Sequence, residues 1–130
     1  RVSNGLGRTT CSYFLPGDER VIYASTHDFD EACPPTPDRS VLKKYVWPIY
    51  NSFEIYSADI DGKNLKRWTN NEFYDAEATV SPDGKKIVYT SNKSGDLEIY
   101  VMDVDGTNEV QSPQSWATMA AHSFLPTANS

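Results

Sequence analysis

The chain has 130 residues, with 12 basic and 18 acidic side chains and a formal net charge of −6. Its apolar fraction of 38% and aromatic fraction of 12% exceed those of a disordered tail, and no apolar run reaches the ~18 residues of a membrane-spanning helix. The acidic balance argues against nucleic acid as a partner, because phosphate binding needs a basic surface. We expect one folded domain or part of one, and an internal piece or processed product because the chain starts with Arg1.

The first element with a repeated pattern is residues 16–25, PGDERVIYAS, which return 66 positions later as PDGKKIVYTS at residues 82–91. In the second copy, the β-branched and aromatic run 86–90 follows an Asp-Gly pair and precedes a polar stretch with Gly95. This composition predicts a short strand between two turns. Each copy should therefore contain the same turn and strand.

An insertion at residues 27–52 follows the first of these strands, and only Asn92 to Asp96 stand there in the second copy. Its aromatic residues Tyr45, Trp47 and Tyr50 are candidate contacts for a partner, because Tyr and Trp are favoured at protein interfaces. The alternative is that these aromatics cover the sheet from which they emerge. The insertion is thus the first candidate for a functional region.

The start of the insertion, residues 27–33, combines one histidine, three carboxylates and Cys33. These are metal-ligand types, but their spacing matches no standard site and the other histidine, His122, is distant in sequence. We predict a solvated loop with a structural cysteine and no metal site. Cys11 and Cys33 are a candidate disulfide, and two unpaired thiols are the alternative.

The next repeated stretch is 53–64, which returns at 97–108 with identical Glu, Ile, Tyr, two Asp, Gly and Asn residues. Its Asp-Gly pairs predict type I′ hairpin turns, because these residues tolerate positive φ. A calcium site at the paired aspartates is an alternative, but the glycine and glutamate spacing of an EF-hand is absent. Further short strands are expected at 65–68 and 77–80.

The repeat unit therefore holds four strands in about 44 residues, which is typical of a β-propeller blade. A β-sandwich, with similarly spaced strands, is the structural alternative. We predict an all-β fold of two four-stranded antiparallel blades, with no segment of helical period. The first blade is assigned to residues 1–62, the second to 63–106 and the start of a third to 107–111.

The last stretch, residues 112–130, lacks strand alternation. Codons for these residues can be chosen from the degenerate genetic code. When they are read in the frame that starts one nucleotide earlier, they encode a Ser-Pro-Asp-Gly motif over positions 125–128. That is 44 positions beyond the same motif at 81–84, where the repeat requires it. We predict an out-of-frame, disordered tail, and a natural polar tail is the alternative.

Residues 81–92 and 97–108 closely resemble the repeat of the TolB-like β-propellers, and the resemblance extends over 10–26 and 53–110. It implies a ring that usually has six blades, so two blades are an incomplete propeller. It also implies a periplasmic or exported bacterial protein that acts as a binding platform. The name-giving member works in an envelope complex with a peptidoglycan-associated lipoprotein. The resemblance transfers no partner-binding residue.

The sequence contains no nucleophile elbow, glycine-rich phosphate loop or paired metal-ligand motif, so we assign no catalytic or cofactor-binding residue. The expected function is a non-catalytic, protein-binding propeller segment. One alternative is the propeller of a larger peptidase or hydrolase whose catalytic domain lies elsewhere, and another is a frameshifted fragment without function. Since two blades cannot close a ring, we also expect self-association, or association with further blades, through exposed blade faces.

Overall fold

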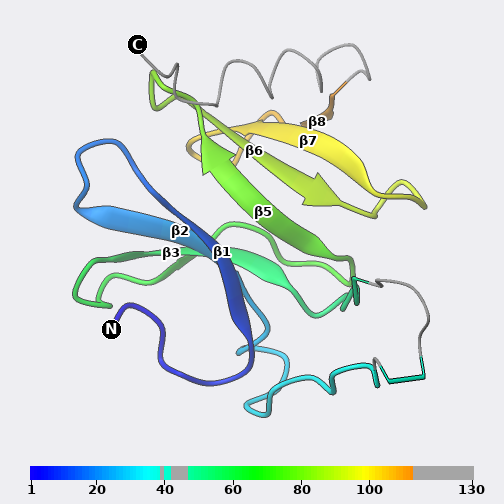
Figure 1. Ribbon diagram of the computed structural model, residues 1–130. Coiled ribbons are helices and arrows are strands. Elements are labelled where there is room, and N and C mark those ends of the chain that lie inside the picture. Colours follow the sequence, from blue (N-terminus) through cyan, green and yellow to red (C-terminus); the bar gives the residue numbers. More distant parts are fainter. Residues whose placement is uncertain (39, 42–46, 113–130) are drawn as a thin grey trace, which may run out of the picture.

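The computed structural model describes residues 1–38, 40–41 and 47–112, and every regular element in these ranges is a β-strand (Figure 1). The strands are β1 (Thr9–Phe14), β2 (Arg20–Ser25), β3 (Glu54–Asp59), β4 (Lys66–Arg67), β5 (Asp75–Val80), β6 (Lys86–Ser91), β7 (Glu98–Asp103) and β8 (Val110–Gln111). They form two four-stranded antiparallel sheets, ordered β1-β2-β3-β4 and β5-β6-β7-β8. The predicted all-β fold of two such sheets is confirmed.

Two of the predictions fall on parts of the chain beyond this description. The candidate contact Tyr45 and residues 113–130 of the expected out-of-frame tail lie outside the described residues. Ser112, where that tail was expected to begin, is described and buried. Its amide donates to the carbonyl of Ile99 at 2.7 Å, so it continues the pairing of β8 with β7.

The sheets divide at a different point from the predicted sequence units. The division falls between Arg67 and Asp75, whereas the predicted units met between residues 62 and 63. Likewise, β8 lies within the stretch expected to start a third blade, but it is the fourth strand of the second sheet. The reason is that each Asp-Gly turn connects strands of one hairpin, so the strand after the turn stays with its partner.

The two Asp-Gly turns are built alike but are not the predicted two-residue type. Gly62 has a φ of +86° and its amide donates to the carbonyl of Asp59 at 2.8 Å, and Gly106 repeats this with a φ of +89° toward Asp103. Neither Asp61 nor its counterpart has a positive φ. Within each Asp-Gly pair only the glycine is left-handed, as in a three-residue hairpin loop, which corrects the type I′ prediction.

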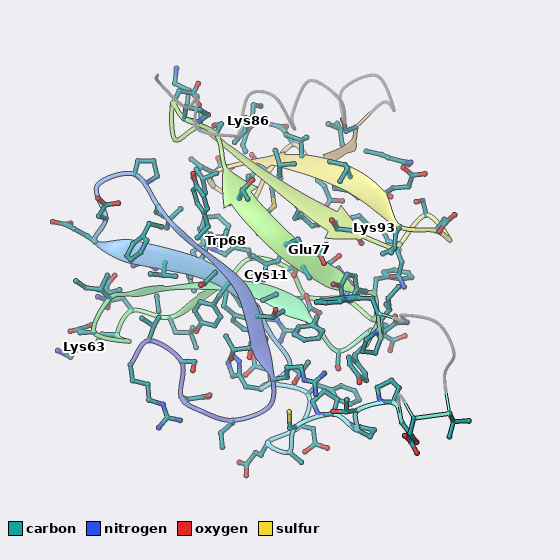
Figure 2. All side chains as sticks on the ribbon, viewed as in Figure 1. Cys11, Lys63, Trp68, Glu77, Lys86 and Lys93 are labelled. Carbon is teal, nitrogen blue, oxygen red and sulfur yellow. The ribbon has the colours of Figure 1, made fainter. Side chains whose placement is uncertain are left out.

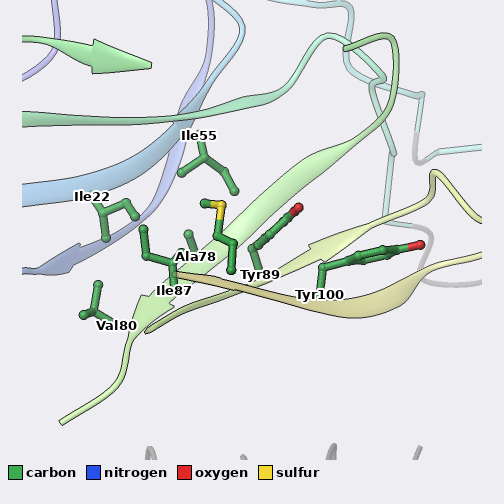
Figure 3. Close-up of a cluster of buried hydrophobic side chains, with 8 residues drawn as sticks. Ile22, Ile55, Ala78, Val80, Ile87, Tyr89 and Tyr100 are labelled. Carbon is green, nitrogen blue, oxygen red and sulfur yellow. The ribbon is translucent and has the colours of Figure 1, made fainter. Parts of the chain in front are cut away.

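The hydrophobic core lies between the two sheets (Figure 3). Ile22 and Ile55 of the first sheet face a larger set of side chains from the second. That set comprises Ala78, Val80, Ile87, Tyr89, Tyr100 and Met102. Trp68, which follows β4, packs against the same cluster and donates its indole N–H to the Ser57 hydroxyl at 3.0 Å. Burial of this apolar surface is the main force that holds the sheets together.

The two sheets meet through opposite faces of equivalent strands. Ile87 and Tyr89 of the second sheet face the first sheet. Their repeat counterparts, Val21 and Tyr23, lie on the face of the first sheet that points away from the second. There they form a separate cluster, against which Val2 packs. Side chains alternate between the faces of a strand, so this arrangement stacks one sheet head-to-tail on the next. Head-to-tail stacking can repeat around a ring, as a propeller requires.

The strands β1 and β5 are neighbours at the junction of the sheets, where β5 packs against the first sheet. Each carries a bulge at the same repeat position, with Cys11 at a φ of +52° and Glu77 at a φ of +56°. Figure 2 labels both side chains near the centre of the molecule. A bulge bends its strand and strengthens its twist, so the sequence repeat extends to irregularities of the backbone.

Candidate functional site

The insertion and the adjoining end of the first sheet enclose a groove of about 670 Å³. In Figure 1 the described part of the insertion, in cyan, runs below the first sheet. The groove is built from the loop after β2, the last described residues of the insertion and the starting end of β3, with the polar segment after β4 on its far side. The sequence repeat supplies the sheet, and the insertion supplies the facing wall.

Apolar residues form the wall that the insertion contributes to the groove. Phe29 is 79% exposed, and Ile49 is also exposed. Pro34 and Pro35 also line the groove. Proline restricts the backbone to an extended form and has no amide to donate, so this wall offers stiff apolar surface. Exposed apolar side chains gathered at a hollow are typical of a contact site.

Glu54, the first residue of β3, lies at the base of the groove with a side chain only 4% exposed. Its Oε1 atom accepts hydrogen bonds from the Asn71 amide at 2.7 Å and from the Arg67 guanidinium at 3.2 Å. Its Oε2 atom has no partner among the described residues. The carboxylate is therefore held firmly through one oxygen, while the other is buried without a donor.

Arg67 and Tyr56 connect Glu54 to the insertion. The Arg67 guanidinium lies 3.4 Å from Asp28 Oδ2 and 5.9 Å from the centre of the Tyr56 ring, and it donates to the Thr69 carbonyl at 2.8 Å. The Tyr56 hydroxyl donates to the same Asp28 oxygen at 2.9 Å. Burial, and next this hydrogen bond to Asp28, raise the pKa of Tyr56. The phenol thus remains a protonated donor that holds the insertion on the sheet.

Within the polar start of the insertion, His27 is packed, whereas residues 28–33 are exposed as in the predicted solvated loop. The His27 side chain is buried, with its ring centre 4.4 Å from that of Tyr56 and its Nδ1 atom 2.9 Å from the Ser25 hydroxyl. Its Nε2 atom lies 3.4 Å from Asp28 Oδ1. In the ranges that the structure describes, no three His, Cys, Asp or Glu side chains gather as a metal site would require. His27 instead anchors the loop to β3.

The three aromatic residues singled out in the insertion have different positions. Tyr50 packs against Phe53, 6.3 Å between ring centres, and its hydroxyl donates to the Pro35 carbonyl. Trp47 is 54% exposed and lines a smaller pocket next to the groove. Tyr45 is not among the described residues. Tyr50 thus lines the groove while also covering the first sheet, and a partner contact by any of the three stays a prediction.

The two cysteines are free thiols in the structure, with Cys33 exposed and Cys11 partly buried. Cys33 lies beside Arg8, and this contact raises the pKa of the Arg8 guanidinium. The Cys11 thiol is 3.3 Å from the Thr10 hydroxyl. The structure therefore shows the unbridged form, and the Cys11–Cys33 disulfide stays a prediction. Comparison of the intact mass before and after reduction would decide it.

The repeated aspartates that end β3 and β7 take part in the hairpin turns. Asp59 accepts from Arg20 at 2.6 Å and from the Asn64 side chain at 2.5 Å. Asp103 accepts from Lys86 at 2.5 Å and from the Asn108 side chain at 2.6 Å. These bonds tie each turn to the preceding strand of the same sheet, as the hairpin interpretation of the Asp-Gly motif requires.

The sequence prediction did not single out Glu54 or Arg67. One signal was present in the repeat itself: the counterpart of Glu54 is Glu98, whereas the counterpart of Arg67 is Gln111. The glutamate is thus the same in both copies of the repeat, but the residue that pairs with it in the first sheet is different in the second. That difference lies next to the insertion, but only the folded chain brings the two regions together.

Comparison with known proteins shows what these sheets resemble. No protein-family model matches the chain. Residues in a 45-residue stretch are 40% identical to the Tol-Pal system protein TolB of Bordetella pertussis, and those of B. parapertussis and B. bronchiseptica match equally. That stretch is 35% of this chain but only 10% of each relative.

Solved structures extend the likeness over most of the chain. The structure of putative TolB from Agrobacterium tumefaciens matches 85% of this chain and 35% of its own, with a TM-score of 0.61 and 20% identity. TolB from Acinetobacter baumannii matches 82% of this chain and 21% of its own, with a TM-score of 0.54 and 23% identity. At these identities the match concerns the fold. The repeat is TolB-like, and the two sheets are β-propeller blades.

Proposed function

We propose that this TolB-like propeller segment is a non-catalytic scaffold that binds a protein partner through the groove beside its insertion. The observation that carries the proposal is the construction of that groove: an exposed apolar wall with Phe29 and Ile49 faces a buried polar base with Glu54 and Arg67. Protein-binding sites combine such apolar surface with a few fixed polar groups. Loops on a rigid scaffold are where recognition residues are usually found.

The polar groups of the groove support binding rather than catalysis. Arg67 bridges Glu54 and Asp28, and Tyr56 donates to Asp28, so these side chains hold one another in place. A nucleophile would need a neighbouring base positioned to activate it, and the described groove residues include no Ser–His or Cys–His pair in that arrangement. A propeller attached to a separate hydrolase domain remains the alternative function, and its catalytic residues would lie in that domain.

We extend to this chain the envelope setting of its relatives. The relatives are named as proteins of the Tol-Pal system, and the chain spans a small part of their length. The structure provides no candidate for a membrane-spanning helix in the residues it describes. We therefore expect the protein in the periplasm of its bacterium. Fractionation of the native cells would test this, and recovery of the protein only with the cytosol would contradict it.

A second proposed contact is the face of the second sheet that points away from the first. Val88 and Ile99 lie there, and their repeat counterparts, Ile22 and Ile55, are fully buried between the sheets. We propose that this face receives a further blade or another copy of the chain. Light scattering coupled to size-exclusion chromatography should show a species larger than 14.6 kDa. A monomer at all concentrations would contradict self-association.

Photo-crosslinking in cells tests the binding role of the groove directly. Phe29 is replaced by the photoreactive amino acid p-benzoylphenylalanine, and adducts formed on irradiation are identified by mass spectrometry. The matched control carries the same replacement at Ile60, which is 55% exposed at the opposite end of β3. We expect an adduct with one protein at position 29 and none at position 60. The identified protein, once purified, should bind the unmodified chain and lose affinity for an Ile49→Asp variant.

Two results would contradict the proposal. The first is the absence of a protein adduct at position 29. The second is an equal set of adducts at both positions, which would indicate random collision rather than a groove-specific contact.

A further inference from the structure

The starting point is the oxygen of Glu54 that lacks a donor. The side chain is more than nine-tenths buried and lines the groove, and Oε2 has no partner among the described residues. A buried carboxylate oxygen without a donor is costly, and native proteins normally pair such groups with protein, solvent or ligand. Oε2 is itself closed to solvent, so a ligand in the groove satisfies this acceptor only after displacing the side chains that cover it.

The charges around this oxygen favour a cation. Asp28 and Glu72 also line the groove, whereas Arg67 is the one basic side chain among its described lining residues. The guanidinium of Arg67 is already committed to Glu54 Oε1, Asp28 and the Thr69 carbonyl. An incoming positive charge would therefore meet an excess of carboxylates.

The shape of the groove favours an organic cation with an apolar stem. The described carboxylates do not come together as a three-ligand metal site. The facing wall is apolar, with Phe29, Pro34 and Ile49 along it. A lysine side chain buries its methylene stem along apolar surface and presents a charged tip. An arginine would prefer two carboxylate oxygens for its planar fork, and Oε1 of Glu54 is already occupied.

We propose that the groove accepts a lysine side chain of the bound partner, with its ammonium group donating to Oε2 of Glu54. This inference rests on the proposed protein-binding function and specifies its chemistry. Asp28 and Glu72 add long-range attraction at the mouth of the groove, and the apolar wall covers the lysine stem. The repeat counterpart Glu98 lies outside the groove and is only partly buried, so the site belongs to the first sheet alone.

The test uses the full chain and a defined peptide, acetyl-Leu-Lys-Leu-amide. A second peptide carries norleucine in place of lysine, which keeps the stem and removes the charge, and a third carries arginine. Dissociation constants are measured by nuclear magnetic resonance titration of the labelled protein. Because a hydrogen bond to a charged group is worth a factor of ten or more, the lysine peptide should bind about tenfold more tightly than the norleucine peptide. Arginine should give no improvement over lysine.

Two variants make the test specific to Glu54. Glu54→Gln keeps an acceptor for the Asn71 amide and removes the charge, so it should abolish the preference for lysine over norleucine. Glu98→Gln makes the same change at the repeat counterpart and should leave both affinities unchanged. Circular dichroism melting of both variants establishes that they fold.

Several outcomes would overturn the lysine site. These are equal binding of the lysine and norleucine peptides, tenfold tighter binding of arginine, or an unaltered preference in Glu54→Gln. Lysine binding that emerges only after Lys43→Ala and Lys44→Ala would also overturn it, since the chain's own lysines would then fill the groove. Each of these results leaves the photo-crosslink at position 29 unaffected, so failure of the lysine site and failure of the protein-binding function can be told apart.

Discussion

The two sheets are copies of one pattern at one end and differ at the other. At the Asp-Gly end, Asn64 and Asn108 adopt left-handed backbones with φ of +51° and +52° and donate to the equivalent aspartates, Asp59 and Asp103. Arg20 and Lys86 complete the same arrangement. The repeat therefore specifies the turn through local hydrogen bonds that any copy of the sequence can form.

At the opposite end, the loop after β2 is the insertion, while the loop after β6 is short. Glu54 is buried beneath the insertion and paired with Arg67, whereas its counterpart Glu98 is half-buried and the counterpart of Arg67 is Gln111. The comparison teaches that the repeat builds the scaffold and that the insertion, with a few changed residues beneath it, builds the site.

The largest expected effect concerns the faces by which the sheets stack. Ile55→Ala should lower the free energy of unfolding by about 2–5 kcal/mol, because it opens a cavity in the core between the sheets. Ile99→Ala, at the counterpart position on the outward face, should cost about half as much or less because Ile99 is only half-buried. Urea unfolding of both variants measures the difference. Equal losses of unfolding free energy in the two variants would contradict the distinction between the packed face at Ile55 and the open face at Ile99.

A smaller loss of stability is expected when Arg67, at the base of the groove, is replaced by the residue at the equivalent position of the second sheet. Arg67→Gln introduces the residue found at position 111 and leaves Glu54 without its cationic partner. The free energy of unfolding should fall by about 1–2 kcal/mol, because a buried carboxylate loses a charged donor. The reverse change, Gln111→Arg, should be nearly neutral since Glu98 is not buried. If both changes have the same effect, the Glu54–Arg67 pair does not distinguish the sheets.

The smallest expected effect is a shift in titration at the shared turn. The side-chain hydrogen bond from Lys86, and next that from Asn108, lower the pKa of Asp103 below its ordinary value of 3.8. The charged form thus stabilises the fold above pH 3.8, and this contribution is lost as the pH falls through the lower folded-state pKa. Lys86→Met should raise the pKa of Asp103 toward 3.8 in a carboxylate titration followed by nuclear magnetic resonance. An unchanged pKa would show that Lys86 does not hold this carboxylate.

Most of the scaffold was predictable because its determinants are local. The identical residues of the two 53–64 and 97–108 copies lie in β3, β7 and their turns, and the β-branched run 86–90 lies in β6. The errors are local as well: the turns are three-residue loops, and the sheets divide after Arg67 rather than at residue 62. A repeat fixes the period of a pattern but does not state where one unit ends.

The site was predictable only in part because it depends on contacts between distant residues. The sequence marked the insertion as the functional region, but of its candidate contacts only Tyr50 lines the groove, and Phe29 and Ile49 of the apolar wall were not singled out. The packing of His27 on Tyr56, and the burial of Glu54 beneath the loop, require the insertion to fold back on β3. No periodicity in residues 27–52 indicates that direction, so these residues emerged only from the folded chain.

The most direct measurement is the affinity for the lysine peptide of a chimera in which residues 27–52 are replaced by residues 93–96, the short loop of the second sheet. If the repeat builds the scaffold and the insertion builds the site, the chimera will unfold cooperatively but will lose the preference for the lysine peptide over its norleucine counterpart. A chimera that keeps this preference, or one that cannot fold, would contradict that division of roles.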